Sequence, residues 1–133
     1  MQAPPDRTTI NSPADVAAIL QPEMSYLEVE QLRTVLLDTR NNVIEILTIY
    51  SGSVNSSQVR IAEVMRPAIR YNAPALVAVH NHPSGDPTPS PDDVAVTRSM
   101  VQAGKLLDID LLDHIIIASA RWVSLKERGL GFS

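Results

Sequence analysis

The feature that most restricts the fold of this chain is an apolar run, residues 75–79, followed by two histidines, a proline-rich loop and a helix start. An uninterrupted apolar run of this length predicts a buried strand. Residues i and i+2 of a strand project from one face, so His80 and His82 should point the same way at its end, and Asn81 the opposite way. Ser90, which is followed by proline, is typical of a helix N-cap.

This segment contains the donor atoms of a metal site. Asp93 stands three residues after Ser90, at N3 of the predicted helix, where its carboxylate can meet His80 and His82 across the loop. Two neutral imidazoles and one carboxylate leave a fourth tetrahedral position open, which is the pattern of a catalytic zinc site. The loop prolines lower the entropy cost of holding this arrangement.

Each part of the motif also has a plainer interpretation. Ser-x-x-Asp is a variant of the capping box, and Ser12 and Asp15 form the same Ser-Pro-x-Asp pattern with no histidine nearby. A single histidine at a strand end is more often a hydrogen-bonded core or rim residue, and a proline-rich loop can be a solvated connection. His-x-His combined with Ser-x-x-Asp at this spacing favours metal binding over these alternatives.

Composition limits the other classes of function. The 133 residues, 44% of them hydrophobic, suit one globular domain. Cysteine is absent, so any metal must be bound by His, Asp or Glu. The net charge of −4, scattered Lys and Arg and 4% aromatic content give no strong nucleic-acid signature. Without a signal region or an apolar run near the roughly 18 residues of a membrane span, we expect a cytoplasmic protein with no membrane contact.

Hydrophobic periodicity predicts one α/β domain with a single mixed sheet flanked by helices. Residues 1–11 are expected to be a flexible lead-in, and Pro22 is expected to end the first helix. Residues 1–26 form the predicted N-terminal part and residues 27–133 the metal-binding domain. Helices are predicted at residues 16–20, 57–71 and 91–106, and strands at residues 32–39, 43–50, 75–80, 111–118 and 121–125.

A hydrolase also needs a base that accepts a proton from the attacking water. The candidates are glutamates outside the loop, namely Glu23, Glu28, Glu30, Glu45 and Glu63. Glu30 directly precedes an apolar strand, and the sheet could place it beside the strand that ends at the histidines. Spacing alone does not choose between Glu28 and Glu30.

HNHPSG, with Ser90 and Asp93, resembles the JAMM motif, Glu…His-x-His-(x)7-Ser-x-x-Asp, of the JAB/MPN+ metalloprotease superfamily. The longer stretch HNHPSGDPTPSPDD and the later LLDHIII resemble the RadC family, from about residue 27 to the C-terminus. This resemblance implies a JAB/MPN-like fold with cytidine-deaminase-like layering. It also implies one zinc ion per chain, held by His80, His82 and Asp93, with Ser90 stabilising the oxyanion and Glu30 as general base.

Two departures from the RadC pattern stand out. Residues 1–26 do not resemble the helix–hairpin–helix region with which RadC-like proteins usually begin, and the family's Pro-Arg-Glu is Ile61-Ala62-Glu63 here. Asp113 and His114 match the family's Asp-His, and we interpret His114 as a structural or second-shell histidine outside the metal set.

We therefore expect a zinc metallopeptidase or isopeptidase that acts on a protein or peptide substrate. The alternative is a non-catalytic RadC-like module that binds a protein in DNA repair or processing, but intact ligands favour the enzyme. An HNH nuclease has dispersed histidines, and zinc deaminases need cysteines that this chain lacks. The sequence gives no indication of oligomeric state.

Overall fold

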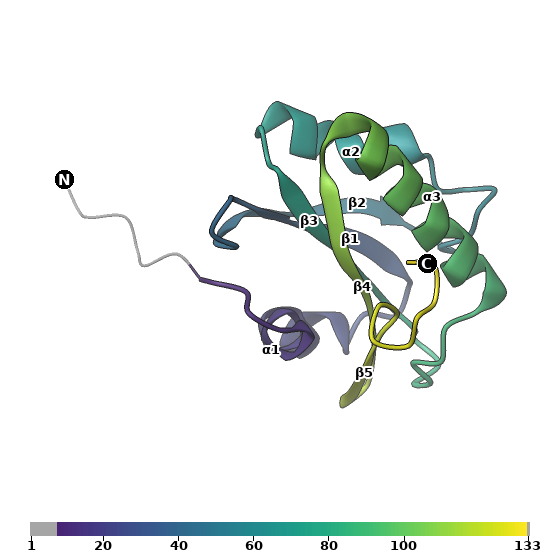
Figure 1. The fold of residues 1–133 in the computed structure, drawn as a ribbon. Coiled ribbons are helices and arrows are strands. Elements are labelled where there is room, and N and C mark those ends of the chain that lie inside the picture. The colour runs from purple at the N-terminus through teal and green to yellow at the C-terminus, as the bar shows by residue number, and fades with distance from the viewer. Residues whose placement is uncertain (1–7, 133) are drawn as a thin grey trace.

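The fold is a single mixed sheet with helices on both faces (Figure 1), in a computed structural model that describes residues 8–132. The strand order is β2-β1-β3-β4-β5. β3 and β4 are parallel, and the other neighbouring pairs are antiparallel. In chain order the elements are α1 (Pro13–Met24), β1 (Gln31–Leu37), β2 (Val43–Ser51), α2 (Ile61–Arg70), β3 (Ala75–Asn81), α3 (Pro91–Leu107), β4 (Asp110–Ala118) and β5 (Arg121–Ser124).

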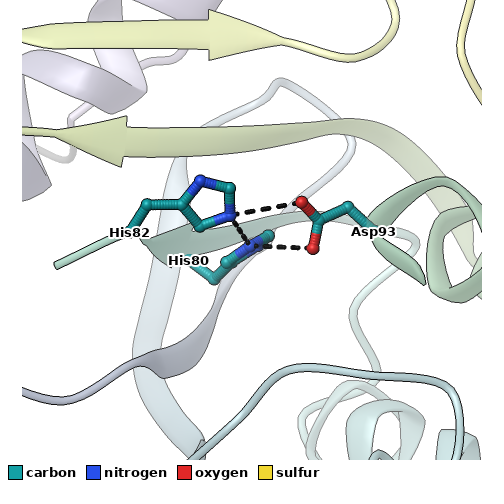
Figure 2. A group of neighbouring side chains, drawn as sticks. All are labelled: His80, His82 and Asp93. Atoms are coloured by element: carbon teal, nitrogen blue, oxygen red, sulfur yellow. Dashed lines mark hydrogen bonds and ion pairs between the residues drawn. The ribbon is translucent and has the colours of Figure 1, made fainter. Parts of the chain in front are cut away.

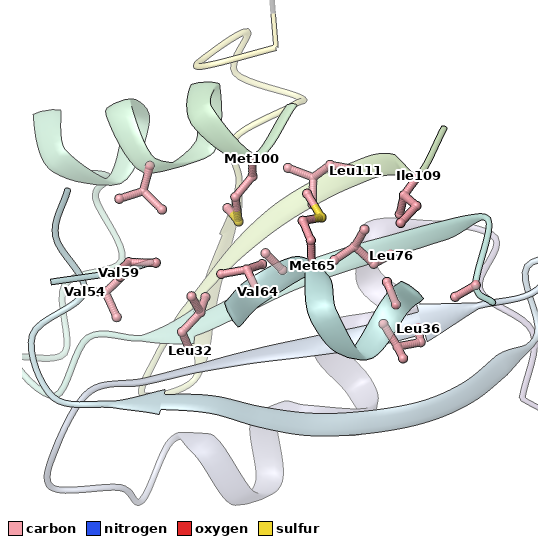
Figure 3. Packing of buried hydrophobic residues seen from close by; sticks show 14 residues of the cluster. Leu32, Leu36, Val54, Val59, Val64, Met65, Leu76, Met100, Ile109 and Leu111 are labelled. Atoms are coloured by element: carbon pink, nitrogen blue, oxygen red, sulfur yellow. The ribbon is translucent and has the colours of Figure 1, made fainter. Parts of the chain in front are cut away.

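The two faces of the sheet bury separate apolar clusters. The α2/α3 face packs Leu32, Leu36 and Leu76 against Val64 and Met100 (Figure 3). The opposite face packs alternate residues of the same strands against α1. Because both faces are covered, β1 is buried from Leu32 to Leu37 and β3 along its whole length, rather than at alternate residues only.

Parallel pairing requires a crossover connection, and α3 provides it by returning the chain from the end of β3 to the start of β4. The loop from β3 to α3 therefore lies at the carboxyl end of β3, where ligand sites in sheets of this type form. β1 runs antiparallel to β3 with Leu32 paired to His80, so the segment that enters β1 lies at the same edge.

The predicted single mixed sheet and the strand–loop–helix unit at residues 75–107 are confirmed. The largest differences in element boundaries are at α1, at the start of α2 and at the end of β1, which is Leu37 rather than residue 39. Pro22 lies inside α1, because it falls in the last turn and the Ser25 N–H still reaches the Gln21 carbonyl. α2 begins at Ile61 rather than near residue 57, because the Asn55 side chain accepts backbone N–H groups of the next residues and holds a turn there.

The expected flexible lead-in is wrong for its described part. The Val43 N–H donates to the Thr8 carbonyl, and the Ile10 N–H donates to the Asn41 carbonyl. Ile10 is buried in the cluster under α1. Residues 1–7 of the predicted lead-in lie outside the described residues. Among residues 8–132, no helix has the length and apolar content needed to cross a membrane.

Candidate metal centre

The predicted ligands converge at the carboxyl end of β3 (Figure 2). His80 Nε2 lies 3.2 Å from Asp93 Oδ1, and His82 Nε2 lies 3.2 Å from Asp93 Oδ2. The two Nε2 atoms are 3.1 Å apart. His80 and Asp93 are buried, whereas His82 is partly exposed. The cluster is therefore a half-open site whose rear side is formed by His80.

The start of α3 places the carboxylate. Ser90 Oγ accepts the Asp93 N–H at 3.0 Å, and Asp93 Oδ2 accepts the Ser90 N–H at 2.8 Å, which completes a capping box. Asp93 Oδ1 remains directed at His80. The first helix, with the same Ser-Pro-x-Asp spacing, has no side-chain cap from Ser12. In this chain the pattern thus produces a full capping box only where it also positions a carboxylate against the histidines.

The hydrogen-bond chemistry of the cluster fits a cation. His82 Nδ1 lies 2.8 Å from the Asp86 carbonyl oxygen, which only accepts, so Nδ1 must be the protonated nitrogen. In neutral His82, Nε2 then directs its lone pair at Asp93 and at His80 Nε2. Two imidazole nitrogens and a carboxylate are a donor set that zinc prefers. The residues present therefore suit a bound divalent metal.

The electrostatics also favour positive charge here. A hydrogen bond to Asp93 raises the pKa of His82, with burial acting in the opposite direction. Burial would raise the pKa of Asp93, but its contacts with His80, His82 and the Ser90 N–H outweigh it, so the pKa is lowered. Asp93 is thus a carboxylate at neutral pH. A proton on His82 and a metal ion would compete for the same place.

Glu30 directly precedes β1 and lies near the ligand cluster. The pairing of Leu32 with His80, continued by two residues, places Glu30 opposite His82. Glu30 Oε2 accepts the Val54 N–H at 2.7 Å, which holds one carboxylate oxygen in place. Glu28 is exposed and does not line the cleft described next. The geometry therefore favours Glu30 over Glu28 as the carboxylate beside the site.

The site opens into a cleft of about 380 Å³. Glu30, His82, Ser90 and Asp93 line it together with Ser53, Val54, Asn55, Pro83, Ser84 and Asp92. The structure thus brings all the predicted site residues to one place, with His80 buried behind the cleft. Glu30 and Ser90 therefore face the same cleft as the exposed side of the ligand cluster.

Three neighbouring residues, Asn81, His114 and Thr97, lie outside the predicted set of ligands and catalytic residues, and only His114 was considered as a contact of that set. Asn81 accepts the Gln31 N–H at 2.7 Å and donates to the Val29 carbonyl at 3.0 Å, so it fixes the backbone on both sides of Glu30. The position of Asn81 between the two histidines was the sequence feature that could have identified it. His114 and Thr97 lie behind His80. The Asp113-His114 pair within an apolar strand pointed to His114, but no sequence pattern pointed to Thr97.

Comparison with known proteins agrees with this architecture. The family model of the RadC-like JAB domain matches residues 10–130. The chain belongs to this family. It is 58% identical over 127 residues to a UPF0758 protein of Roseiflexus castenholzii, covering 96% of this chain and 54% of that protein. A UPF0758 protein of Chloroflexus aurantiacus is likewise 58% identical over 127 residues, with 96% of this chain and 56% of the relative covered.

A more distant UPF0758 protein, from Desulfitobacterium hafniense, is 50% identical over 124 residues, covering 93% of this chain and 55% of the relative. The chain spans about half the length of these relatives. Family membership and the JAB-like fold are therefore established, and the cluster of His80, His82 and Asp93 could hold a metal ion, as a JAMM-type site would. The names of the relatives state no activity.

Proposed function

We propose that this domain is a zinc-dependent hydrolase that cleaves amide bonds, as a peptidase or isopeptidase, in a protein or peptide substrate. The observation that supports it best is the convergence of two imidazole nitrogens and a carboxylate beside a cleft that a second carboxylate, Glu30, also lines. One zinc ion per chain would be held by His80, His82 and Asp93. When bound, zinc supplies Lewis acidity that lowers the pKa of water and polarises a carbonyl.

The chain's own residues account for the proton transfers. Glu30 accepts a proton from the attacking water as its oxygen adds to the amide carbon. Glu30 Oε2 is held by the Val54 N–H, so a fixed carboxylate is available for this transfer. The same proton is delivered to the amide nitrogen when the C–N bond breaks, and the products are a carboxylic acid and an amine. Glu30 thus ends each cycle in its starting state.

Ser90 has the role of an oxyanion donor in this proposal. Its oxygen already accepts the Asp93 N–H, so its own proton remains available to donate. Ser90 lines the cleft, where this proton can reach the oxygen of a tetrahedral intermediate. Loss of one such donor typically costs about 100- to 1,000-fold in rate. Ser90→Ala is therefore expected to reduce turnover more strongly than it reduces zinc content.

The test combines zinc content with a substrate screen. Protein purified without chelator or histidine tag should contain about one zinc per chain, and His82→Ala should lose it. Peptides and lysine-linked isopeptides are then screened for cleavage by the zinc-loaded protein. Glu30→Gln should keep the zinc and lose cleavage, because glutamine retains an acceptor for the Val54 N–H but cannot take the proton.

Glu28→Gln is the matched control, since Glu28 is exposed and lies outside the cleft. It should behave as wild type in both assays. Equal cleavage by the Glu30 and Glu28 variants would contradict the role of Glu30. Folded protein that contains no zinc and takes up none on addition would contradict the hydrolase and support the binding-module alternative.

A further inference from the structure

His114 is a fully buried histidine that the proposed function does not use. It lies on β4, which is parallel to β3, and its ring is directed at the rear of the ligand cluster. His114 Nε2 lies 2.7 Å from His80 Nδ1. On its other side, His114 Nδ1 lies 2.5 Å from Thr97 Oγ1. Thr97 is fully buried on α3 and its Oγ1 lies 2.6 Å from the Asp93 carbonyl oxygen.

His80, His114, Thr97 and the Asp93 carbonyl thus form a series of hydrogen bonds. The position of each proton in it follows from the last acceptor, the Asp93 carbonyl oxygen. The Asp93 carbonyl oxygen only accepts, so the Thr97 hydroxyl must donate its single proton to it. Thr97 Oγ1 is then available only as an acceptor, and His114 Nδ1 must carry a proton to donate to it. In neutral His114, Nε2 has a lone pair and accepts from His80 Nδ1. His80 is therefore protonated on Nδ1.

Burial supports the neutral form of His114. The side chain has no solvent exposure, and its hydrogen-bond partners are a hydroxyl and another imidazole rather than a carboxylate. Transfer of an unpaired charge into such surroundings is strongly unfavourable. Each of the three hydrogen bonds in the series then has one donor and one acceptor.

We propose that His114 and Thr97 are positioning residues that hold His80 in the Nδ1-protonated tautomer, with the lone pair of Nε2 directed at Asp93 and His82. This inference rests on the metal site of the proposed function. The series runs from one ligand, His80, to the backbone of another, Asp93, so it also ties the end of β3 to the first turn of α3. The ligand on β3 and the ligand on α3 are thereby oriented before a metal binds.

The two histidine ligands are oriented by different means. His82 Nδ1 donates to a loop carbonyl, that of Asp86, and remains partly exposed. His80 has no backbone acceptor for Nδ1 among its described contacts and uses the side chains of two other elements instead. Outer partners of metal-bound histidines typically change metal affinity by about 10- to 100-fold when they are removed. We expect removal of the Thr97 hydroxyl to weaken zinc binding by a similar factor.

The experiment compares zinc affinity in Thr97→Val, Thr97→Ser and Thr34→Val, with folding checked by circular dichroism. Valine keeps the shape of threonine and removes the hydroxyl, so Thr97→Val should bind zinc about 10- to 100-fold more weakly. Thr97→Ser retains the hydroxyl and should restore near-wild-type affinity. Thr34 is the matched control, because it is fully buried in β1 and its hydroxyl has no hydrogen-bond partner among the described residues. Thr34→Val should leave the affinity unchanged.

A second readout is the tautomer of each histidine, measured by nitrogen-15 NMR in metal-free protein. The proposal requires a proton on His80 Nδ1 and on His114 Nδ1, and none on His114 Nε2. Equal zinc affinity of all three variants and wild type would overturn it, as would a His80 Nδ1 without a proton. If wild-type protein binds no zinc, the proposed function fails, and the tautomers still decide this inference. If wild type binds zinc and Thr97→Val binds it equally well, only this inference fails.

Discussion

Asp93→Asn separates the helix-capping role of Asp93 from its role as a ligand. In the structure one carboxylate oxygen accepts the Ser90 N–H and the other is directed at His80. Asparagine keeps an acceptor for the Ser90 N–H, so most of the capping box survives, and loss of the whole cap would cost only about 1 kcal/mol. What asparagine removes is the negative charge that a zinc ion requires. The variant should therefore fold like wild type but bind zinc weakly.

The expected change in Tm follows from the linkage between zinc binding and folding. A ligand at 100 times its dissociation constant stabilises the native state by about 2.7 kcal/mol. If the substitution weakens zinc binding about 100-fold, the same zinc concentration stabilises the variant by only about 0.4 kcal/mol. For a domain of this size, 1 kcal/mol corresponds to roughly 4 °C in Tm. Zinc should thus raise the Tm by roughly 10 °C in wild type and by less than about 2 °C in Asp93→Asn.

The assay is thermal unfolding with chelator and with excess zinc, and Asp15→Asn is the control. Asp15 occupies the same place in a Ser-Pro-x-Asp sequence, and its carboxylate accepts the Asn11 N–H at 2.8 Å, with no histidine contact. Asp15→Asn should show the full zinc-dependent shift of wild type. An Asp93→Asn protein with the wild-type shift would refute Asp93 as a ligand. Loss of the shift in both variants would show that helix capping, rather than metal ligation, produces it.

Three further substitutions test the scaffold. Asn81→Ala leaves the Val29 carbonyl and the Gln31 N–H without their partner, so the free energy of unfolding from denaturant titration should fall by about 2–4 kcal/mol while zinc still binds. Gly104→Ala gains about 1 kcal/mol of helix propensity, but its Cβ would lie 2.2 Å from the Ile109 carbonyl oxygen, so a net loss of about 1–3 kcal/mol is expected in the same titration. Burial raises the pKa of Asp113 above 3.8, so its ionisation destabilises the folded state, increasingly as the pH rises through the raised pKa. Asp113→Asn should therefore gain stability relative to wild type as the pH rises from about 4 through the raised pKa, and a constant difference over that range would contradict this.

The part of the site that could be predicted from sequence is the part that is local. His80, His82, Ser90 and Asp93 lie within one strand–loop–helix segment, where alternation along the strand and the helix start fix the directions of the side chains. Glu30 could only be proposed, because its place depends on the antiparallel pairing of β1 with β3.

Contacts between residues far apart in the sequence could not be predicted from local patterns. Thr97 contacts His114 only because α3 crosses back so that β4 pairs in parallel with β3, and no local pattern marks a threonine in a helix as a partner of a histidine in a strand. The turn held by Asn55 and the pairing of residues 8–10 with the hairpin turn were missed for a related reason. Both depend on hydrogen bonds of individual backbone groups rather than on periodicity.

The predicted ligands and Glu30 come from two separate segments of the chain, so substitutions can alter one without the other. All three ligands come from residues 80–93, so the chain that must close around the metal is short and the entropy cost of its closure is small. Glu30 reaches the cleft from the segment that enters β1, and the Val54 N–H holds its carboxylate in place. In the proposed function, capture of the metal and activation of water are therefore separable. A substitution at Glu30 should then abolish cleavage in one step and leave metal binding, the fold and the ligand loop intact.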